Sequence, residues 1–595
     1  MRKTLLSLAS MLAITGVLLA ACAAPATETP QSPASSEEET APEVAAPEPA
    51  ASDLVYERSE TLYTSGTQWG PPTNWNPMVT WGYAMGTVGL CYETLFLYDP
   101  LTDEYTPWLA ASGEWTSDNV YELKLREGIN WSDGEAFTAE DVVFTFDLGK
   151  KFPSVQYSPM WDWLESVEQV DDYTVQFAFS DPLYQEWTNF LYTRAMLPQH
   201  LWENKTEEEV VSGANENPVG TGPYLYETHD QDRMVWIKND NWWATEQLDL
   251  EVAPKRIVDI VNGSNSVALG LILQGGIDIG NNFLPGIATL VNGGYGVQTY
   301  YSEPPYMISA NTAWLIMNNT IAPMDDPAFR KAMAYAIDVN QIVEVVYGNI
   351  VRAANPTGLL PNWDQYIDKD LVEEMGFSYD PDEARSILAE AGYVDNDGDG
   401  FVEAPDGSAI ELSIVVPNGW TDWMESVRVI ASGAQAVGIN LEPKFPDFGG
   451  YADARNGGTY EMAIVNDAQI SNTPWTYYDW IFQEPIQETM TNGNYQRYEN
   501  PAAFDLVVQL DKTPVDDVAQ MQEVISELQR IQLTDMPLIP LWYNGLWSQY
   551  NNTIWTNWPS AEADSPNYLP ATWRGYWNMG SLLMLTELQP AEAAE

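Results

Sequence analysis

Basic residues are scarce in this chain of 595 residues, and their scarcity limits its partners. There are 25 Lys and Arg against 86 Asp and Glu, which gives a formal net charge of −61. A charge of this sign repels phosphate backbones and anionic lipid head groups, so nucleic acid is excluded as a partner. Because the acidic residues are spread along the chain, they are expected to form a solvated surface rather than one acidic site.

Histidine and cysteine are also rare, which limits catalysis and metal binding. The two histidines, His200 and His229, stand apart in the sequence, and no Cys/His cluster offers nitrogen or sulfur ligands for a metal such as nickel. General acid–base catalysis by histidine is barely available, and the chain has no GxSxG motif, Walker loop or Cys/His nucleophile pattern. The sequence therefore predicts a protein that is not an enzyme and requires no cofactor.

The longest apolar run, residues 5–20, is confined to the N-terminus. Arg2 and Lys3 precede it and Leu-Ala-Ala-Cys ends it, which predicts a signal peptide over residues 1–21. The ending resembles the bacterial lipoprotein box, in which the cysteine, here Cys22, is acylated and tethers the mature chain to the outer face of the cytoplasmic membrane. An ordinary secretory signal with a chance cysteine is the alternative. Either a cell surface or a periplasm would fit this location.

Residues 22–55 are rich in Pro, Ala and Glu and have almost no large apolar side chains, so they are expected to form an extended, disordered spacer. Cys91 is then the only other cysteine, and without a disulfide partner it is expected to be a buried small hydrophobe. The whole chain is 45% hydrophobic and 12% aromatic, enough for at least two sizeable cores.

From Tyr56 onward the pattern mixes strands and helices without an internal repeat, which predicts an α/β (mixed α+β) fold. Alternating apolar residues over 120–125 predict a strand. A helix is expected after Thr138, with Asp141 as the partner in a capping box. Further helices are predicted from Pro327, after the cap Asp326, and from about Pro514 to residue 533.

The stretch VDNDGDGFVE, residues 394–403, resembles a calcium loop. Its alternating carboxylates and its glycines suit the wrapping of oxygen ligands around a hard cation. A helix over 381–391 precedes it, but a turn and a strand follow it, so it is not a paired EF-hand. A structural Ca²⁺ or an unoccupied polar turn are the two alternatives. The candidate ligands are Asp395, Asp397, Asp399, Glu403 and Asp406.

Five segments together give a family resemblance. In order they are LKLREGINWSDGEAFTAEDVVFTF from residue 123, NPVGTGPY from 217, VWIKNDNWW from 235, LQGGIDIG from 273 and DDPAFRKAMAYAIDVNQIVEVVYG from 325. This series is similar to the extracellular solute-binding proteins of family 5, which serve ABC importers and include binders of dipeptides, oligopeptides, nickel and cello-oligosaccharides. The resemblance covers roughly residues 56–585.

The resemblance implies a two-lobed, periplasmic-binding-protein-like fold with an extra subdomain in the N-terminal lobe, a hinge, and a ligand between the lobes. Lobe one would take residues 56–305 and 546–587, and lobe two would take 306–545, with a tail at 588–595. The calcium-like loop would then brace lobe two outside the cleft. A monomer that docks on ABC permease subunits is expected.

The residues themselves bear on the solute. The chain has 25 Trp and 32 Tyr, and flat rings stack on the apolar faces of sugars while amides and carboxylates bind hydroxyl groups. The better candidates stand in polar loops and at the carboxyl ends of strands, where α/β proteins bind ligands. They are Trp69, Trp75, Asn418, Trp420, Asn466, Asp467, Trp475 and, less favoured because it could equally pack between lobes, Trp542.

Peptide binders of this family carry an Asp four residues before a loop proline, where it pairs with the peptide's α-ammonium group. Here Ile470 stands four residues before Pro474, although Asp467 is close by. We therefore expect an oligosaccharide, β-linked and of the cello- or hemicellulose type, with an oligopeptide as the alternative. A surface adhesin or scaffold, which would need neither hinge nor cleft, is a third class.

Overall fold

The structure is a computed structural model that describes residues 56–66, 68–79, 83–571, 573 and 576–591. The predicted signal peptide, Cys22 and the spacer lie outside the described residues. No described helix is both long and apolar enough to cross a membrane. Cys91 is buried, as the sequence predicts.

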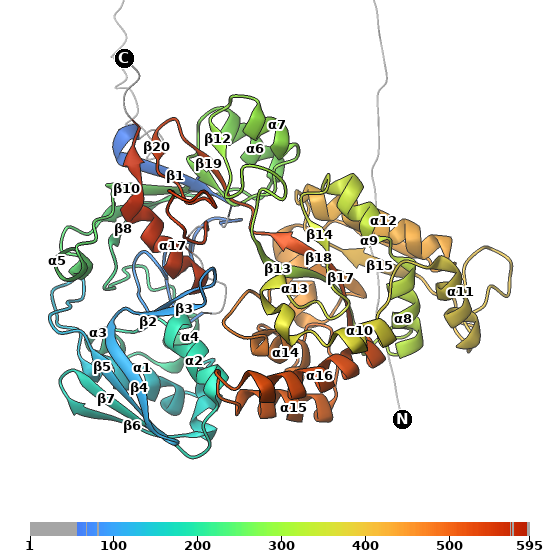
Figure 1. The fold of residues 1–595 in the computed structure, drawn as a ribbon, viewed down its shortest axis with the longest axis horizontal. Coiled ribbons are helices and arrows are strands. Elements are labelled where there is room, and N and C mark those ends of the chain that lie inside the picture. Colours follow the sequence, from blue (N-terminus) through green and yellow to red (C-terminus); the bar gives the residue numbers. More distant parts are fainter. Residues whose placement is uncertain (1–55, 67, 80–82, 572, 574–575, 592–595) are drawn as a thin grey trace, which may run out of the picture. The chain divides into compact units, whose positions relative to one another are not determined.

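The first strand, β1 (Thr61–Ser65), lies inside a seven-stranded mixed sheet in the order β12-β19-β11-β1-β10-β9-β8 (Figure 1). It pairs in parallel with β10 and β11. Because β19 comes from the C-terminal part, the end of the chain returns to the sheet that its beginning forms. The other strands are β8 (Tyr224–His229), β9 (Arg233–Lys238), β10 (Arg256–Ile260), β11 (Ile279–Gly280), β12 (Val297–Gln298) and β19 (Gln549–Asn551).

Further elements accompany this sheet. The helices are α5 (Trp243–Leu248), α6 (Asn265–Leu273), α7 (Ile287–Asn292) and α17 (Tyr576–Glu587), and the short strand pairs are β2 (Phe96–Asp99) with β3 (Glu104–Pro107) and β20 (Trp555–Thr556) with β21 (Gln589–Pro590).

A separate four-stranded antiparallel sheet has the order β4-β5-β7-β6. In β7, Val175, Phe177 and Phe179 alternate with less buried residues, so one face of this sheet is apolar. Helices α1 and α2 pack on that face, where Trp187 of α2 contacts the ring of Phe177. The elements here are β4 (Ala110–Ser117), β5 (Val120–Leu125), β6 (Leu164–Asp171), β7 (Thr174–Phe179), α1 (Ala139–Lys151), α2 (Tyr184–Thr193), α3 (Gln199–Trp202) and α4 (Glu207–Ser212).

A six-stranded mixed sheet, in the order β14-β18-β13-β17-β15-β16, organises the rest of the chain. Its central strands are buried on both faces: in β13, Leu315 packs into one core with α8, α11 and α12, whereas Trp314 and Ile316 pack into another with α14, α15 and α16. The strands are β13 (Ser309–Met317), β14 (Arg352–Ala353), β15 (Leu412–Val415), β16 (Leu441–Lys444), β17 (Met462–Val465) and β18 (Leu538–Gly545).

The helices of this part cover both faces of the sheet. They are α8 (Pro327–Ala336), α9 (Val339–Gln341), α10 (Lys369–Met375), α11 (Pro381–Glu390), α12 (Thr421–Ala436), α13 (Phe448–Gly457), α14 (Trp475–Phe482), α15 (Pro501–Asp511) and α16 (Val518–Asp535). In Figure 1, α15 and α16 lie beside α2, and α15 packs directly against α2.

Several helix starts agree with the sequence prediction. Thr138 and Asp141 form the expected capping box of α1, and the Asp326 carboxylate caps α8. By contrast, α16 begins at Val518 rather than near Pro514, because Asp517 accepts the hydrogen bond of its first turn.

The residues that follow Trp420 predict a helix capped by Thr421 or Asp422, and this predicted cap of α12 is wrong. The N-cap position is Trp420, which makes no side-chain cap bond. The Thr421 hydroxyl and the Asp422 carboxylate instead accept hydrogen bonds from the Asn265 amide. Asp422 also accepts one from the Tyr347 hydroxyl.

Candidate functional site

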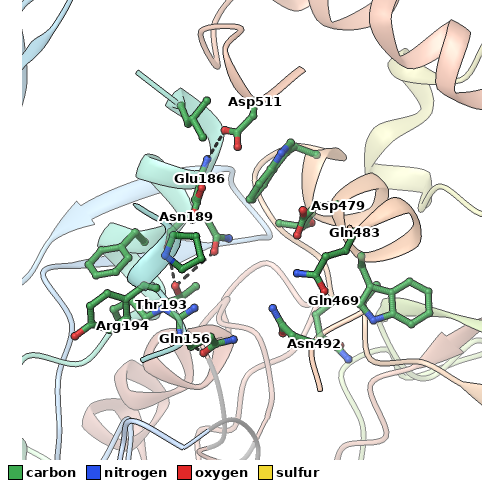
Figure 2. Close-up of a pocket in the computed structure, with 18 of the residues that line it drawn as sticks. Gln156, Glu186, Asn189, Thr193, Arg194, Gln469, Asp479, Gln483, Asn492 and Asp511 are labelled. Carbon is green, nitrogen blue, oxygen red and sulfur yellow. Dashed lines mark hydrogen bonds between the residues drawn. The ribbon is translucent and has the colours of Figure 1, made fainter. Parts of the chain in front are cut away.

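A cavity of about 460 Å³ lies between two groups of elements (Figure 2). One group, here called the α2 wall, consists of lining residues between 77 and 195, with α2 at its centre. The other, the α14 wall, consists of lining residues between 467 and 511 and includes α14 and α15. Ligand pockets for small molecules have volumes of roughly 300–1,000 Å³, so the space suits a solute of that class.

The helix α2 contributes the polar part of its wall because α2 is amphipathic. Trp187 faces the core of the four-stranded sheet, and Phe190 lies between that core and the cavity. Glu186, Asn189 and Thr193 line the cavity, since residues three and four apart share one face of a helix. The Asn189 amide donates to the Tyr192 hydroxyl over 2.8 Å.

Arg194, which follows the last residue of α2, also lines the cavity. Its Nη1 donates to Gln156 Oε1 over 2.6 Å, which holds the guanidinium against the wall. Burial lowers the pKa of Arg194. The side chain nevertheless stays charged at neutral pH, because a guanidinium begins from a pKa above 12.

The α14 wall combines aromatic rings with hydrogen-bonding groups. Trp475, Asp479, Trp480 and Gln483 line the cavity from one side of α14, and Tyr477 on the other side packs into the core of the six-stranded sheet. The indole N–H groups of both tryptophans lack a hydrogen-bond partner within the described residues. Both rings are largely buried, at 8% and 6% exposed, so α14 offers a small apolar surface beside amide and carboxyl oxygens.

Asp467 and Gln469 follow strand β17 at its carboxyl end and line the same wall. The Asp467 carboxylate lies 2.5 Å from Arg455 Nη1, so its charge is already matched within the protein. Gln469 Oε1 accepts from Asn311, and Asn311 in turn accepts from Asn466 over 3.2 Å. Asn466 is absent from the lining but holds Gln469 from behind: its backbone oxygen accepts from Gln469 Nε2 over 2.8 Å, and its side chain acts through Asn311.

Three carboxyl groups lie towards one end of the cavity, Glu186 on the α2 wall and Asp479 and Asp511 on the α14 wall (Figure 2). The Glu186 backbone N–H donates to Asp511 Oδ1 over 2.9 Å. Burial, and then the charge of Asp479, raise the pKa of Glu186 to about 7, and burial raises the pKa of Asp479 to about 7 as well. Burial and the neighbouring Glu186 carboxyl raise the pKa of Asp511 well above its usual range.

Two of the tryptophans predicted from separate loops come together away from this cavity. The rings of Trp69 and Trp420 lie 5.6 Å apart, and Phe448 of α13 lies 5.2 Å from Trp69. Neither tryptophan lines the cavity described above. Asn418, which stands before Trp420, is exposed.

The remaining predicted tryptophans lie in the core. Trp75 is 2% exposed, and its indole N–H donates to the Met234 sulfur over 3.1 Å. Trp542 is fully buried in β18, where its N–H donates to Asn544 Oδ1. Their rings are packed against protein, so neither presents a stacking surface to the cavity.

Most of the polar lining was not predicted from the sequence. Glu186 and Asn189 of α2, Arg194 at its end and Asp511 of α15 belong to segments that carry no recognisable binding motif. The sequence does point to one of the lining residues, Asp479. It is the lone charged residue in the aromatic helix WTYYDWIF, and a charged residue in such a helix is either paired or functional.

The acidic loop after α11 is a separate candidate centre. Ligand oxygens of Asp395, Asp397, Asp399 and Glu403 all lie within 4.8 Å of one another. Such an all-oxygen donor set fits Ca²⁺. Asp406 is outside this group, and its carboxylate accepts from the backbone N–H of Ser408 instead. None of these residues lines the cavity.

The comparison with known proteins gives the class. A family model for bacterial extracellular solute-binding proteins, family 5, matches residues 104–488, more than half of the chain. The chain belongs to this family, whose members are solute-binding components of ABC importers and not enzymes.

Individual relatives support this assignment. A periplasmic oligopeptide-binding protein of Thermotoga maritima, solved with bound mannohexaose, is 45% identical, with a TM-score of 0.87 over 90% of this chain and 99% of that chain. The dipeptide-binding protein of Escherichia coli is 28% identical over 504 residues, 79% of this chain and 87% of that protein.

A more distant structure agrees in fold. AppA of Bacillus subtilis, solved with a nonapeptide, has a TM-score of 0.73 at 19% identity, covering 89% of this chain and 99% of that chain. These neighbours are two-lobed binding proteins, which confirms the predicted fold class.

Proposed function

We propose that this solute-binding protein captures an oligosaccharide in the cavity between the α2 and α14 walls and delivers it to an ABC importer. The observation that carries the proposal is the composition of the cavity. Trp475 and Trp480 stand among the amides of Asn189, Gln469 and Gln483. Aromatic rings suit the apolar faces of a sugar, and amides both donate to and accept from its hydroxyl groups.

Two further observations support a sugar. The Thermotoga relative, at 45% identity, is described with mannohexaose. In addition, Arg455 already matches the charge of Asp467, the residue nearest to the position where family peptide binders hold the α-ammonium group. We propose a β-linked chain of the cello- or hemicellulose type, among which manno-oligosaccharides are included.

An oligopeptide is the second candidate, and one observation favours it. Glu186, Asp479 and Asp511 make no ion pair within the described part of the chain, so an ammonium group would find carboxylates at this end of the cavity. The dipeptide-binding and nonapeptide-binding relatives agree with this alternative.

A thermal-shift panel separates the two. Cello-, xylo-, manno- and xyloglucan-oligosaccharides would be compared with mixed di- to penta-peptides at fixed salt and calcium. A ligand that binds only the folded form raises Tm by mass action, by several degrees at saturation. A shift with one sugar series alone would support the proposal, and a shift with peptides alone would contradict it.

A variant pair then locates the site. Trp475→Ala removes a lining ring and is expected to abolish the sugar shift. Trp115→Ala removes a partly exposed ring on β4, outside the cavity, and is expected to keep it. A sugar shift that survives Trp475→Ala but is lost in Trp420→Ala would move the site to the cluster of Trp69, Trp420 and Phe448.

Two proposals concern the rest of the chain. Acylation of Cys22 would tether the protein to the outer face of the cytoplasmic membrane, where a monomer could meet the permease. The four carboxylates of the loop at 395–403 would hold a structural Ca²⁺, a role supported by their convergence and by the all-oxygen donor set.

A further inference from the structure

The end of the cavity formed by Glu186, Asp479 and Asp511 has an unusual charge balance. Glu186 belongs to the α2 wall, whereas Asp479 and Asp511 belong to the α14 wall. No ion pair neutralises any of the three within the described residues. Asp511 is 5% exposed, and Glu186 and Asp479 are only partly open to the cavity.

Glu186 interacts with the other two residues across the cavity, whereas Asp479 and Asp511 share the α14 wall. Asp511 accepts the backbone N–H of Glu186, and the charge of Asp479 acts on Glu186. In a two-lobed protein that opens between its walls, separation would return the carboxyl groups to water and remove the repulsion between Glu186 and the other two. Carboxyl groups buried in one cavity without an ion pair favour the protonated form, because burial and neighbouring negative charge both disfavour ionisation.

We infer that closing of the cavity takes up protons at the Glu186, Asp479 and Asp511 cluster, so that capture of the solute is coupled to pH. The inference rests on the proposed role of this cavity as the solute site. It adds that pH, and not the solute alone, controls closing.

The other charged and titratable groups around the cluster do not neutralise its three carboxyl groups, so the protons are still needed. They are Arg194, Tyr157 and Tyr83 on the α2 wall, Asp467 with its partner Arg455, Glu484, and the pair formed by Asp181 and Lys512. The Arg194 guanidinium lowers the pKa of Glu186 only in part, because burial and Asp479 act in the opposite direction. Asp467 and Asp181 are already matched by their own cations.

The direction of the pH effect follows from linkage. Carboxyl groups in the open form should titrate near their ordinary pKa of about 4. In the closed form, Glu186 and Asp479 have pKa values of about 7. At a pH between these two pKa values, the carboxyl groups are protonated only in the closed form. Closing is therefore weakened about tenfold per pH unit for each coupled proton as pH rises from about 4 to 7, with little further change above that.

The test uses the ligand-free protein, so it does not depend on which solute binds. Spin labels at Val170→Cys and Tyr379→Cys, two exposed positions on the two sides of the cavity, would report the separation of the lobes in a Cys22→Ser background. The buried Cys91 should remain unlabelled, because burial raises the pKa of its thiol and restricts access.

The expected result is a closed fraction that falls between pH 5 and pH 7 and then levels off. Glu186→Gln with Asp479→Asn should flatten this profile. Asp181→Asn breaks the exposed ion pair with Lys512, which also joins the two sides of the cavity. This variant should keep the pH dependence of the closed fraction. An identical distance distribution at pH 5 and pH 8 in the labelled chain that keeps Glu186 and Asp479 would overturn the inference, whatever the variants do.

Calorimetry with mannohexaose separates this inference from the proposed function. If mannohexaose binds, titrations at pH 6 in two buffers of different ionisation enthalpy should show proton uptake, and no uptake would contradict the coupling. If mannohexaose and the other sugars fail to bind while the ligand-free profile still depends on pH, the coupling stands and the proposed sugar does not.

Discussion

Gln185 offers a way to weaken the closed form without touching the solute. Its side chain is 1% exposed, belongs to α2 and is absent from the cavity lining. Its Nε2 donates to the Thr513 carbonyl over 2.8 Å, and its Oε1 accepts from the Thr473 hydroxyl over 2.6 Å. Both partners belong to the part of the chain built on the six-stranded sheet, so the amide joins the two sides of the cavity.

The size of the effect follows from these two bonds. In Gln185→Ala, the closed form would leave the Thr473 hydroxyl and the Thr513 carbonyl without this partner, whereas the open form would expose both to water. Each buried hydrogen bond has a net value of about 0.5–1.5 kcal/mol, so closing should lose about 1–3 kcal/mol. Because binding requires closing, the solute affinity should fall by about 5- to 150-fold.

The assay is calorimetric titration with the best solute from the thermal-shift panel. Gln169→Ala, at an exposed position on β6, is the matched control and should leave Kd within about twofold. The loss in Gln185→Ala should lie mainly in a faster dissociation rate, since the amide acts after the solute has entered. An unchanged Kd in Gln185→Ala would refute the assignment of this contact as a latch of the closed form.

Two other predictions concern the parts outside the cavity. Chelation of Ca²⁺ should lower Tm of the unsubstituted chain, whereas Asp397→Asn should start lower and respond little, because a structural ion stabilises only the folded form; an unchanged Tm on chelation would contradict the calcium proposal. Cys22→Ser should move the protein from the membrane fraction to the soluble fraction when cells are fractionated, and an unchanged distribution would argue against acylation at Cys22.

Local chemistry could be predicted well from the sequence. The capping box of Thr138 and Asp141 and the cap at Asp326 depend on residues within three positions of each other, and the structure confirms them. The alternation over residues 120–125 likewise predicts a strand, and the structure has β5 at Val120–Leu125. Trp475 and Asp467 could be predicted to line a site because they follow the strand β17, at the edge where ligands of α/β proteins bind.

The cavity as a whole could not be predicted in this way, since its walls are joined by interactions between residues far apart in sequence. Glu186 and Asp511 are separated by 325 residues, and their raised pKa values come from burial and from charges brought near by distant parts of the chain. Trp75 shows the same limit: it stands in a polar, proline-rich loop but is buried because its indole bonds Met234 of β9.

A crystal structure of the protein with the solute that gives the largest thermal shift is the first measurement to make, because it shows directly whether an oligosaccharide lies between the α2 and α14 walls. We expect a sugar ring stacked on Trp475 or Trp480, with hydroxyl groups on the amides of Asn189, Gln469 or Gln483. A peptide whose α-ammonium group sits on Glu186, Asp479 or Asp511, or a sugar bound elsewhere, would contradict this expectation.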